Sequence, residues 1–263
     1  MNKELIYVVK IGGNIIDDEL RLAAFLESFA RLRAKKILVH GGGKLATSLA
    51  TDLNIPQQMV EGRRITDTET LKIITMVYAG YINKNIVAQL QSAGCNAIGL
   101  SGADANLILA HKRQNSVIDY GYVGDIYRVN SDELHALLSR GLSMVVAPLT
   151  HNGQGQLLNT NADTIAQAIA TSMAGRYCVE LIYSFEKPGV LLNVDDESSV
   201  IPKLTPALYE RYREEKKIFA GMIPKIDNAF TAISAGVHKV IIGKAEELEK
   251  LISGTGGTSL SYE

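Results

Sequence analysis

The sequence predicts an α/β fold in which helices flank a parallel sheet. Short runs rich in β-branched residues alternate along the chain with longer amphipathic segments, which is typical of parallel strands joined by crossover helices. The first two strand-like runs are each followed by glycines and then by a helical pattern. The chain therefore opens with two units of strand, turn and helix.

The elements of these two units follow directly from the pattern. In chain order we expect a strand at 5–11, glycines at 12–13, a helix to about residue 33, a strand at 36–40, glycines at 41–43 and a helix at 44–53.

A longer helical pattern comes next. Thr66 and Glu69 have the spacing of a capping box, and the apolar pattern behind them continues to about Ser92. Gly80 interrupts this pattern, so we expect a kink or a division there.

The middle of the chain changes character. Apolar and polar residues alternate over 107–129, and Gly121 and Gly124 lie between the two strand-like runs. This pattern favours an antiparallel hairpin. Around it we expect a strand at 96–100, a helix at 132–140 and a strand at 144–147. The polar, glycine-containing stretch 150–158 is the expected boundary between two lobes, 1–150 and 151–263.

The second half repeats the alternation of helices and strands. Thr205 is a suitable N-cap, and Pro206 suits the first turn of the helix behind it. The expected elements are a helix at 164–174, a strand at 179–184, helices at 206–219 and 226–235, and a strand at 238–242.

Composition excludes several classes of protein. Lys plus Arg number 27 against 28 for Asp plus Glu, so no global field draws the chain to nucleic acid or to an anionic membrane. No apolar run approaches the roughly 20 residues of a membrane helix, and the N-terminus does not resemble a signal peptide. Cys95 and Cys178 lie far apart in apolar stretches, which favours buried reduced thiols. We therefore expect a soluble cytoplasmic protein.

The glycine turns are the first candidate binding features. Gly12 and Gly13 let the main chain approach a phosphate closely, and the N–H groups at a helix start favour anions. The segment HGGGKLATS is not a P-loop, because Leu45 follows Lys44 where that motif requires Ser or Thr. Lys10 ends an otherwise apolar strand beside a glycine pair, which speaks against a purely solvent-facing lysine.

Five segments together carry a resemblance to a known family. They are VVKIGGN around Lys10, VHGGG ending at Gly43, GRRITD around Arg64, NTNAD at 159–163 and GMIPKI around Lys225. In this order they resemble the motifs of the N-acetylglutamate kinases, which have the amino acid kinase fold. The resemblance implies a three-layer αβα sandwich on a mostly parallel open sheet. It also implies an N-terminal lobe that binds the amino acid and a C-terminal lobe that binds ATP.

The resemblance assigns roles to the residues that match these motifs. It implies that Lys10 and Lys225 contact the transferring phosphoryl group and that Asp163 orients them. Gly42 and Gly43 would bind the phosphoryl group or the acceptor carboxylate through their N–H groups. Arg64 and Asn159 would hold the acylated glutamate.

The chemistry suits these residue types. Phosphoryl transfer depends on positioning and on charge stabilisation, so cations and N–H donors matter more than covalent groups. A carboxylate acceptor is already ionised at neutral pH and needs no general base. Mg²⁺ is expected to arrive with ATP, coordinated largely by phosphates and water, so we name no protein metal ligand.

Alternatives remain open at this stage. Lys44 stands where the family usually has proline, and Lys44 and Arg63 together add charge that suits an acyl group ending in a second carboxylate, such as succinyl. The segment SFEKPG at 184–189 replaces a shorter, aspartate-containing turn of the family, so the ATP contacts there are open. Kinases of this fold acting on aspartate, free glutamate, carbamate or a nucleotide are rival enzymes, and a catalytically silent sensor of an amino acid or a nucleotide is a rival of another class.

The assembly is also an expectation. Arginine-inhibited relatives carry an additional N-terminal helix that links dimers into hexamers, whereas the first strand here begins at about Leu5. We expect a homodimer that is insensitive to arginine, with residues 66–92 at its interface.

Overall fold

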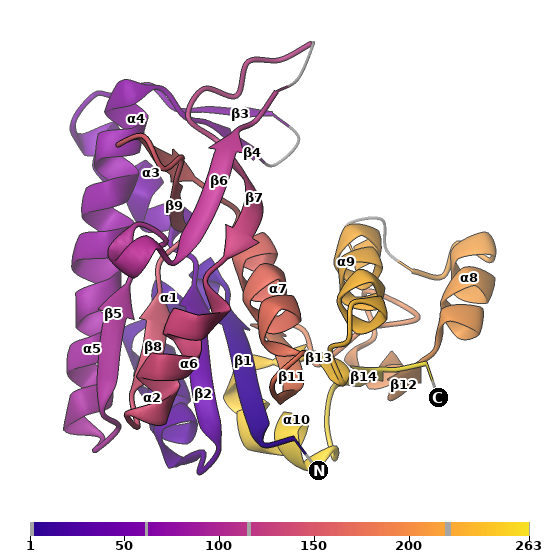
Figure 1. Cartoon of the computed structure of the whole chain (residues 1–263). Coiled ribbons are helices and arrows are strands. Elements are labelled where there is room, and N and C mark those ends of the chain that lie inside the picture. The colour runs from indigo at the N-terminus through magenta and orange to yellow at the C-terminus, as the bar shows by residue number, and fades with distance from the viewer. Residues whose placement is uncertain (1–2, 61–62, 115–116, 219–221, 263) are drawn as a thin grey trace.

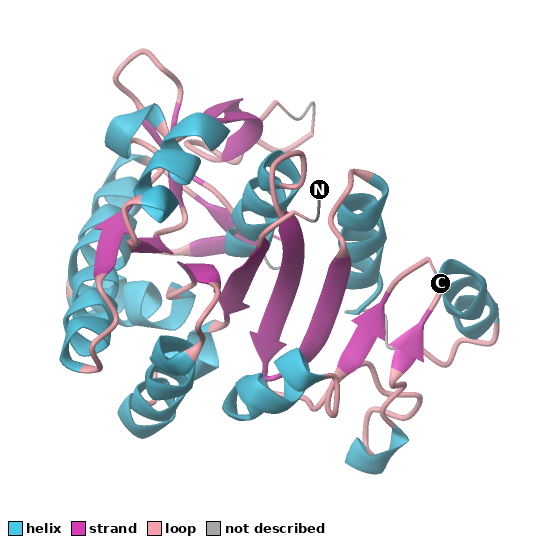
Figure 2. Ribbon diagram, turned by 60° about the horizontal axis from the view of Figure 1, so that its bottom comes forward, coloured by secondary structure: helices cyan, strands magenta, loops and turns pink. Residues whose placement is uncertain are grey.

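The computed structural model describes residues 3–60, 63–114, 117–218 and 222–262. Its main sheet has eight strands, seen in magenta at the centre of Figure 2. In spatial order they are β12 (Lys203–Leu204), β14 (Thr258–Leu260), β13 (Lys239–Lys244), β11 (Cys178–Phe185), β1 (Leu5–Ile11), β2 (Lys35–His40), β8 (Ser143–Val146) and β5 (Ala97–Leu100). Only the β13–β14 pair is antiparallel within this described sheet.

Helices cover both faces of this sheet, as Figure 1 shows. One face packs against α6 (Ser131–Ser139), α7 (Ala162–Met173), α8 (Pro206–Glu214) and α9 (Ile223–Ser234). The other packs against α1 (Gly13–Ile16), α2 (Glu19–Arg31), α3 (Gly43–Asp52), α4 (Thr68–Ile74), α5 (Asn83–Ser92) and α10 (Leu248–Ser253). The expected three-layer αβα sandwich on a mostly parallel sheet is therefore confirmed.

The central strand β1 shows why the strands read as nearly continuous apolar runs. Ile6 and Val8 belong to the core under α7 and α9, whereas Val9 and Ile11 belong to the core on the opposite face. A strand buried on both faces needs apolar residues at every position. Lys10, near the end of β1, is the departure from this rule.

The long helical pattern forms one continuous helix, and the expectation about its cap was wrong. Asp67, and not Thr66, caps α4, because its carboxylate accepts a 2.8 Å hydrogen bond from the N–H of Thr70. Gly80 lies within a π-helical segment, Thr75–Ile82, so the interruption expected there takes the form of a π-helical segment between α4 and α5. Thr66 instead pairs with Gly121 in a β-bridge.

A second, four-stranded sheet carries the expected antiparallel hairpin. Its spatial order is β10 (Leu157–Asn159), β9 (Leu149–His151), β6 (Ile108–Lys112) and β7 (Gly124–Val129). The expected lobe boundary at 150–158 thus forms most of the β9–β10 hairpin, and the main sheet draws strands from both sides of it. A short hairpin of β3 (Gln58–Val60) and β4 (Arg63–Ile65) completes the strands.

Several smaller details differ from expectation. The helix expected to reach residue 219 ends at Glu214, and residue 219 lies outside the described part of the chain. The next helix begins at Ile223, three residues earlier than expected. Cys95 is buried, but Cys178 is only partly so, and both are free thiols. Short 3₁₀ turns lie at Asp104–Asn106, Glu197–Ser199 and Ala245–Glu247.

No helix in the described residues combines the length and the apolarity that crossing a bilayer requires.

Candidate active site

Two glycine turns meet at the carboxyl edge of the main sheet. Gly12 and Gly13 follow β1 and Gly41–Gly43 follow the neighbouring β2, and the N–H of Gly41 donates to the carbonyl of Ile11 over 3.2 Å. Ligands of open parallel sheets bind at this edge. The sequence therefore brings two glycine turns to the place where a ligand is expected.

Gly42 is required for this turn. Its φ of +147° lies in a region that side chains rarely adopt, and a Cβ there would stand 3.1 Å from Tyr78 and collide with Ile82. Both neighbours come from the π-helical segment, which thus packs directly against the turn.

A buried polar pair supports the same turn from behind. His40, at the end of β2, donates from Nδ1 to the carbonyl of Gly41 over 2.8 Å, and its Nε2 accepts from Asn83 Nδ2 over 3.2 Å. This pattern uses the neutral tautomer with its proton on Nδ1. Burial agrees with it, because it lowers the pKa of His40 from 6.5 to about 4.

Three charged side chains from three distant parts of the chain converge beside the first turn. Lys10 Nζ lies 2.7 Å from Asp163 Oδ1, and Lys225 Nζ lies 3.9 Å from Asp163 Oδ2. Their side chains are 12%, 19% and 32% exposed in the order Lys10, Asp163 and Lys225. Asp163 thus stands between two lysines that remain within reach of solvent.

The two lysines line one cavity. Its volume is about 230 Å³, and its walls are Lys10, Gly12, Gly13, Asn14, Ile15, Phe185, Glu186 and Lys225. Backbone N–H groups of a glycine turn and two ammonium groups are the donors that a phosphate group needs. This cavity is therefore the candidate site for the phosphates.

The electrostatics of the cluster follow from burial and from charge. Burial alone would raise the pKa of Asp163, but the ammonium groups of Lys10 and then Lys225 hold it below its ordinary value. Burial lowers the pKa of Lys225, as does the charge of Lys10, while Asp163 and Glu186 oppose that shift. Lys225 therefore holds its proton less tightly than a lysine in water.

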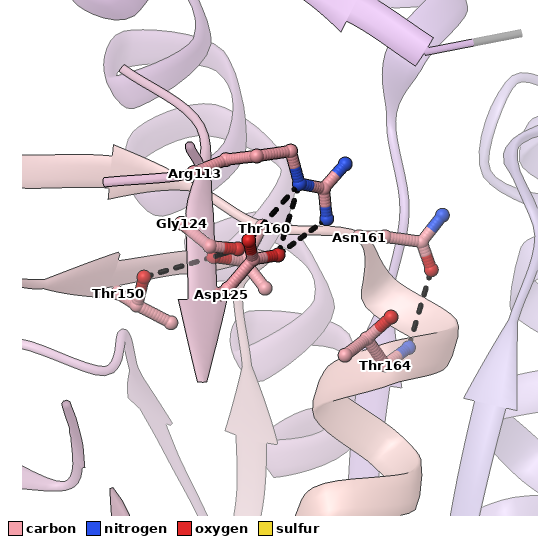
Figure 3. A network of polar contacts seen from close by, with 7 residues as sticks. All are labelled: Arg113, Gly124, Asp125, Thr150, Thr160, Asn161 and Thr164. Atoms are coloured by element: carbon pink, nitrogen blue, oxygen red, sulfur yellow. Dashed lines mark hydrogen bonds and ion pairs between the residues drawn. The ribbon is translucent and has the colours of Figure 1, made fainter. Parts of the chain in front are cut away.

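The start of α7 positions Asp163. Asn161 caps this helix, because its Oδ1 accepts from the N–H groups of Asp163 and Thr164 over 2.8 and 3.2 Å. Figure 3 shows the contacts that fix the preceding residue: Thr160 Oγ1 lies 2.8 Å from Thr150 Oγ1 and donates to the carbonyl of Gly124. The first turn of α7 is thereby tied to the smaller sheet.

The same network carries an ion pair that sequence reasoning missed. Arg113 on the hairpin reaches Asp125 of β7, with Nε 2.9 Å from Oδ1 and 3.2 Å from Oδ2 (Figure 3). Both side chains are partly exposed. This pair links the two segments of the hairpin next to the residues that hold α7.

A second cluster gathers around the Gly43 end of the other turn. Arg64 is buried, and its Nη2 donates to the carbonyl of Gly43 over 2.9 Å and to Thr47 Oγ1 over 2.8 Å. Its Nη1 donates to Gln57 Oε1. Asn159 Nδ2 donates to Thr66 Oγ1 over 3.0 Å, and Thr66 in turn donates to the carbonyl of Arg64. Arg64 and Asn159 are thus connected through Thr66.

The two remaining candidates are exposed side chains next in sequence to Gly43 and Arg64 of the second cluster. Lys44 is largely exposed, and its Nζ lies 3.9 Å from Asp17 Oδ2. Arg63 is exposed on β4, next to the buried Arg64. In the described part of the chain, neither forms an ion pair with Asp163, the partner of Lys10 and Lys225, so neither belongs to the charged cluster at the cavity.

Phe185 and Glu186 are cavity residues that sequence reasoning did not single out, although they lie in the segment 184–189 whose ATP contacts were left open. A phenylalanine that ends an apolar strand is ordinarily a core residue, and nothing in its spacing distinguishes it. Its place in that segment, at the carboxyl end of β11, was the available clue.

The described residues offer no ready-made metal cage. Within residues 3–60, 63–114, 117–218 and 222–262, no three His, Cys, Asp or Glu side chains gather closely enough to hold a metal ion. Glu186 is the one acidic residue among the described residues that line the cavity. Asp163 is a neighbour of this cavity through its ion pairs with Lys10 and Lys225.

Comparison with known proteins places this site in a family. The sequence profile of the amino acid kinase family matches residues 6–244. The chain belongs to this family. It is 55% identical to the acetylglutamate kinase of Cytophaga hutchinsonii over 258 residues, covering 97% of this chain and 98% of that protein. It is 50% identical to the acetylglutamate kinase of Bacteroides fragilis over 258 residues, covering 98% and 97%.

Solved structures agree with the fold of this amino acid kinase. The protein smu.665 from Streptococcus mutans has a TM-score of 0.79 at 26% identity, with 98% of this chain and 99% of that chain covered. The N-acetylglutamate synthase from Neisseria gonorrhoeae complexed with coenzyme A and N-acetyl-glutamate has a TM-score of 0.82 at 22% identity, covering 100% of this chain and 60% of that one. The second likeness concerns the fold alone.

Proposed function

We propose that this chain transfers the γ-phosphoryl group of ATP to the side-chain carboxylate of N-acetyl-L-glutamate, as a step of arginine biosynthesis. Its acetylglutamate kinase relatives support this reaction at 50 to 55% identity over nearly the whole chain. The structural observation that carries the proposal is that Lys10 and Lys225 line one cavity and share Asp163 as their ion-pair partner.

The residues suit the reaction in distinct ways. A carboxylate oxygen of the acceptor attacks the γ-phosphorus, the bond from that phosphorus to the β–γ bridging oxygen breaks, and ADP leaves with the electron pair. Lys10 and Lys225 offset the negative charge on the transferring group, and Gly12 and Gly13 offer N–H donors beside them. No side chain has to remove a proton, since the acceptor is already ionised.

Asp163 keeps the site assembled before ATP arrives. Two ammonium groups in one cavity repel each other, and a carboxylate between them compensates that repulsion. Its ionised state is secured by the same lysines that hold its pKa down.

The acceptor belongs at the other turn in this proposal. Gly42 and Gly43 would offer N–H groups, Arg64 would grip a carboxylate of the acylated glutamate, and Asn159 would hold the acyl amide. The link from Arg64 through Thr66 to Asn159 supports a common site. Residues 1–150 would then supply most of the acceptor site, and 151–263 the ATP site with Phe185 and Lys225.

Mg²⁺ is proposed to enter with ATP. When bound it neutralises phosphate charge, and it keeps several water ligands. The donor set of the cavity, rich in ammonium and N–H groups, suits phosphate oxygens and leaves the metal to the nucleotide.

N-succinyl-L-glutamate is the second candidate acceptor, favoured by the exposed cations Lys44 and Arg63 near the motifs of the acceptor. One assay separates the candidates: trapping of the acyl phosphate with hydroxylamine, using N-acetyl, N-succinyl and free glutamate in parallel. Hydroxamate from the acetyl compound at the highest kcat/KM supports the proposal. A higher kcat/KM with the succinyl compound would show that N-succinyl-L-glutamate is the acceptor. A product from free glutamate alone would reject both acylated acceptors.

The rival from another class, a silent sensor, is tested by the same assay. A chain that binds ATP in calorimetry but forms no hydroxamate from any of the three acceptors is a sensor and not a kinase. The presence of both lysines in one cavity, with Asp163 as their shared partner, supports the enzyme.

We also propose a cytoplasmic homodimer. Met76 and Tyr81 in the π-helical segment are 54% and 63% exposed. They are five residues apart, the spacing of a π-helical hydrogen bond, and so lie on one side of the helix. Figure 1 shows α4 and α5 along the same side of the molecule as the edge strand β5. A second copy would cover these apolar side chains.

A further inference from the structure

Phe185 contacts the charged cluster through Lys225. Lys225 Nζ lies 5.3 Å from the centre of the Phe185 ring, over its face. Phe185 is the last residue of β11 and packs against the core beneath α7 and α9, so its ring is held by the fold. An ammonium over a ring face at this distance is attracted by the electron-rich face.

Lys225 needs such a restraint because its ion pair with Asp163 is long. The short ion pair of Asp163 is made with Lys10 at 2.7 Å, and the contact with Lys225 is 3.9 Å. A lysine has a flexible stem of four carbons, and fixing it costs conformational entropy. Without a second partner the ammonium would sample positions away from the cavity.

A ring restrains an ammonium without neutralising it. A carboxylate in the same place would cancel the positive charge and occupy N–H donors that a phosphate oxygen needs. A ring face does neither to the same degree, because its attraction comes from a quadrupole and not from a net charge.

We propose that Phe185 is a positioning residue for Lys225. The ring face of Phe185 holds the ammonium group of Lys225 at the cavity, and it leaves the charge and the N–H donors of that group available for a transferring phosphoryl group. This inference rests on the proposed kinase function. Phe185 itself makes no bond to the reacting atoms.

The first test changes the ring in Phe185→Leu, Phe185→Tyr and Phe185→Trp. The leucine variant should lower kcat by about 2- to 30-fold, the range of a cation–π contact, with the KM of the acceptor unchanged. The tyrosine and tryptophan variants should keep most of the activity. Phe230→Leu is the matched control, since Phe230 packs against the same core but its ring lies tilted against that of Tyr209, with 5.7 Å between the ring centres, and it should leave kcat near that of the wild type.

The second test keeps the shape of the ring at position 185 and changes only its charge distribution. Pentafluorophenylalanine at position 185 reverses the quadrupole of the ring at nearly constant volume, so it should behave like the leucine variant. This measurement decides the question even if Phe185→Leu fails to fold. Activity equal to that of the wild type with the fluorinated ring would overturn the proposal.

The third test asks whether the effect passes through Lys225. In a Lys225→Met background, Phe185→Leu should cause no further loss of kcat. A loss as large as in the wild-type background would show that Phe185 acts elsewhere, and would overturn the proposal.

A readout without turnover separates this inference from the proposed function. The pKa of Lys225, followed by NMR of its side chain, should fall in Phe185→Leu, because the ring face favours the charged form. An unchanged pKa overturns the positioning role even if the wild type is an active kinase. If the pKa falls but no hydroxamate forms from any acyl glutamate, the contact is real and the kinase proposal fails.

Discussion

At the scale of single residues, one carboxylate decides whether two lysines can share a cavity. Burial disfavours the charged form of Asp163. The attraction of the neighbouring ammonium groups outweighs this effect and holds the pKa of Asp163 below its ordinary value. The ionised carboxylate is therefore bound more favourably in the folded chain than in the unfolded one. That difference is measurable as stability.

Asp163→Asn should reduce the free energy of unfolding at neutral pH by roughly 3 kcal/mol, as expected for a buried ion pair that loses one partner. Because the folded-state pKa is depressed, this stabilisation is present above the ordinary pKa of 3.8 and disappears as the pH falls through the lower folded value. Denaturant titrations of both proteins across the acid range provide the check. A gap between them that stays constant down to the lowest pH would contradict the assignment.

Arg64→Lys should raise the KM of the acceptor by about 10-fold or more, with a smaller effect on kcat, since it removes binding that ground state and transition state share. The fork of Arg64 donates to Gly43, Thr47 and Gln57, and a lysine cannot reproduce this geometry. Steady-state kinetics with ATP saturating measure the effect. Arg63→Lys, one residue away and exposed, is the control, and an unchanged acceptor KM in Arg64→Lys would place the acceptor elsewhere.

At the scale of elements, the turn after β2 and the π-helical segment fit each other. Gly42 has a backbone conformation that excludes most side chains, and Ile82 and Tyr78 fill the space where a Cβ would stand. The π-helical geometry places both side chains there. Such segments occur frequently at functional sites.

Gly42→Ala should destabilise the fold by about 2 kcal/mol or more, from backbone strain and overpacking together. Gly80→Ala is the matched control, because Gly80 lies in the same helical rod with nothing within 4 Å of its Cβ position. That change should be neutral or should stabilise by about 0.5–1 kcal/mol. Thermal unfolding of the pair measures both, and equal melting temperatures would show that the turn is not constrained as described.

Local sequence patterns predicted most helices and strands. They failed where contacts between distant parts of the chain determine the local conformation. The glycine turns and strand order of the opening units follow from short-range pattern, because parallel strands have strong apolar runs. Thr66 and Asp67 are both good caps, and the pairing of Thr66 with Gly121 selected Asp67. Apolar residues at helical spacing do not distinguish an α-helix from a π-helical turn, so the segment around Gly80 was out of reach.

The candidate site was predictable to a similar extent. Lys10, Asp163 and Lys225 are far apart in sequence, and only the resemblance of their motifs to a family indicated that they meet. The contact of Phe185 with Lys225 could not be foreseen, since it depends on how β11 and α9 face each other.

At the scale of the whole molecule, the main sheet joins the two halves of the chain. β1 and β2 come from the first half, and β11 and β13 from the second, with β1 paired to β11 at the centre. The charged cluster lies on this seam, because Lys10 ends β1 while Lys225 belongs to α9 of the second half. A shift of one half against the other would therefore change the distance between the two lysines.

The assembly is tested on the exposed side of the π-helical segment. Tyr81→Glu should convert a dimer to a monomer in light scattering, because a charge buried in an apolar interface is unpaired. Tyr127→Glu is the control, since Tyr127 is similarly exposed at 57% but lies on β7. A wild-type chain that is monomeric, or a dimer that survives Tyr81→Glu, would reject this interface.

The central claim is that Lys10 and Lys225 together offset the negative charge of a phosphoryl group in transit. Its most direct measurement is kcat for hydroxamate formation in Lys10→Met and Lys225→Met, with ATP and N-acetyl-L-glutamate saturating and with folding verified by thermal melting. Each variant should lose about 10²- to 10³-fold in kcat. Folded variants that turn over as fast as the wild type would contradict the account.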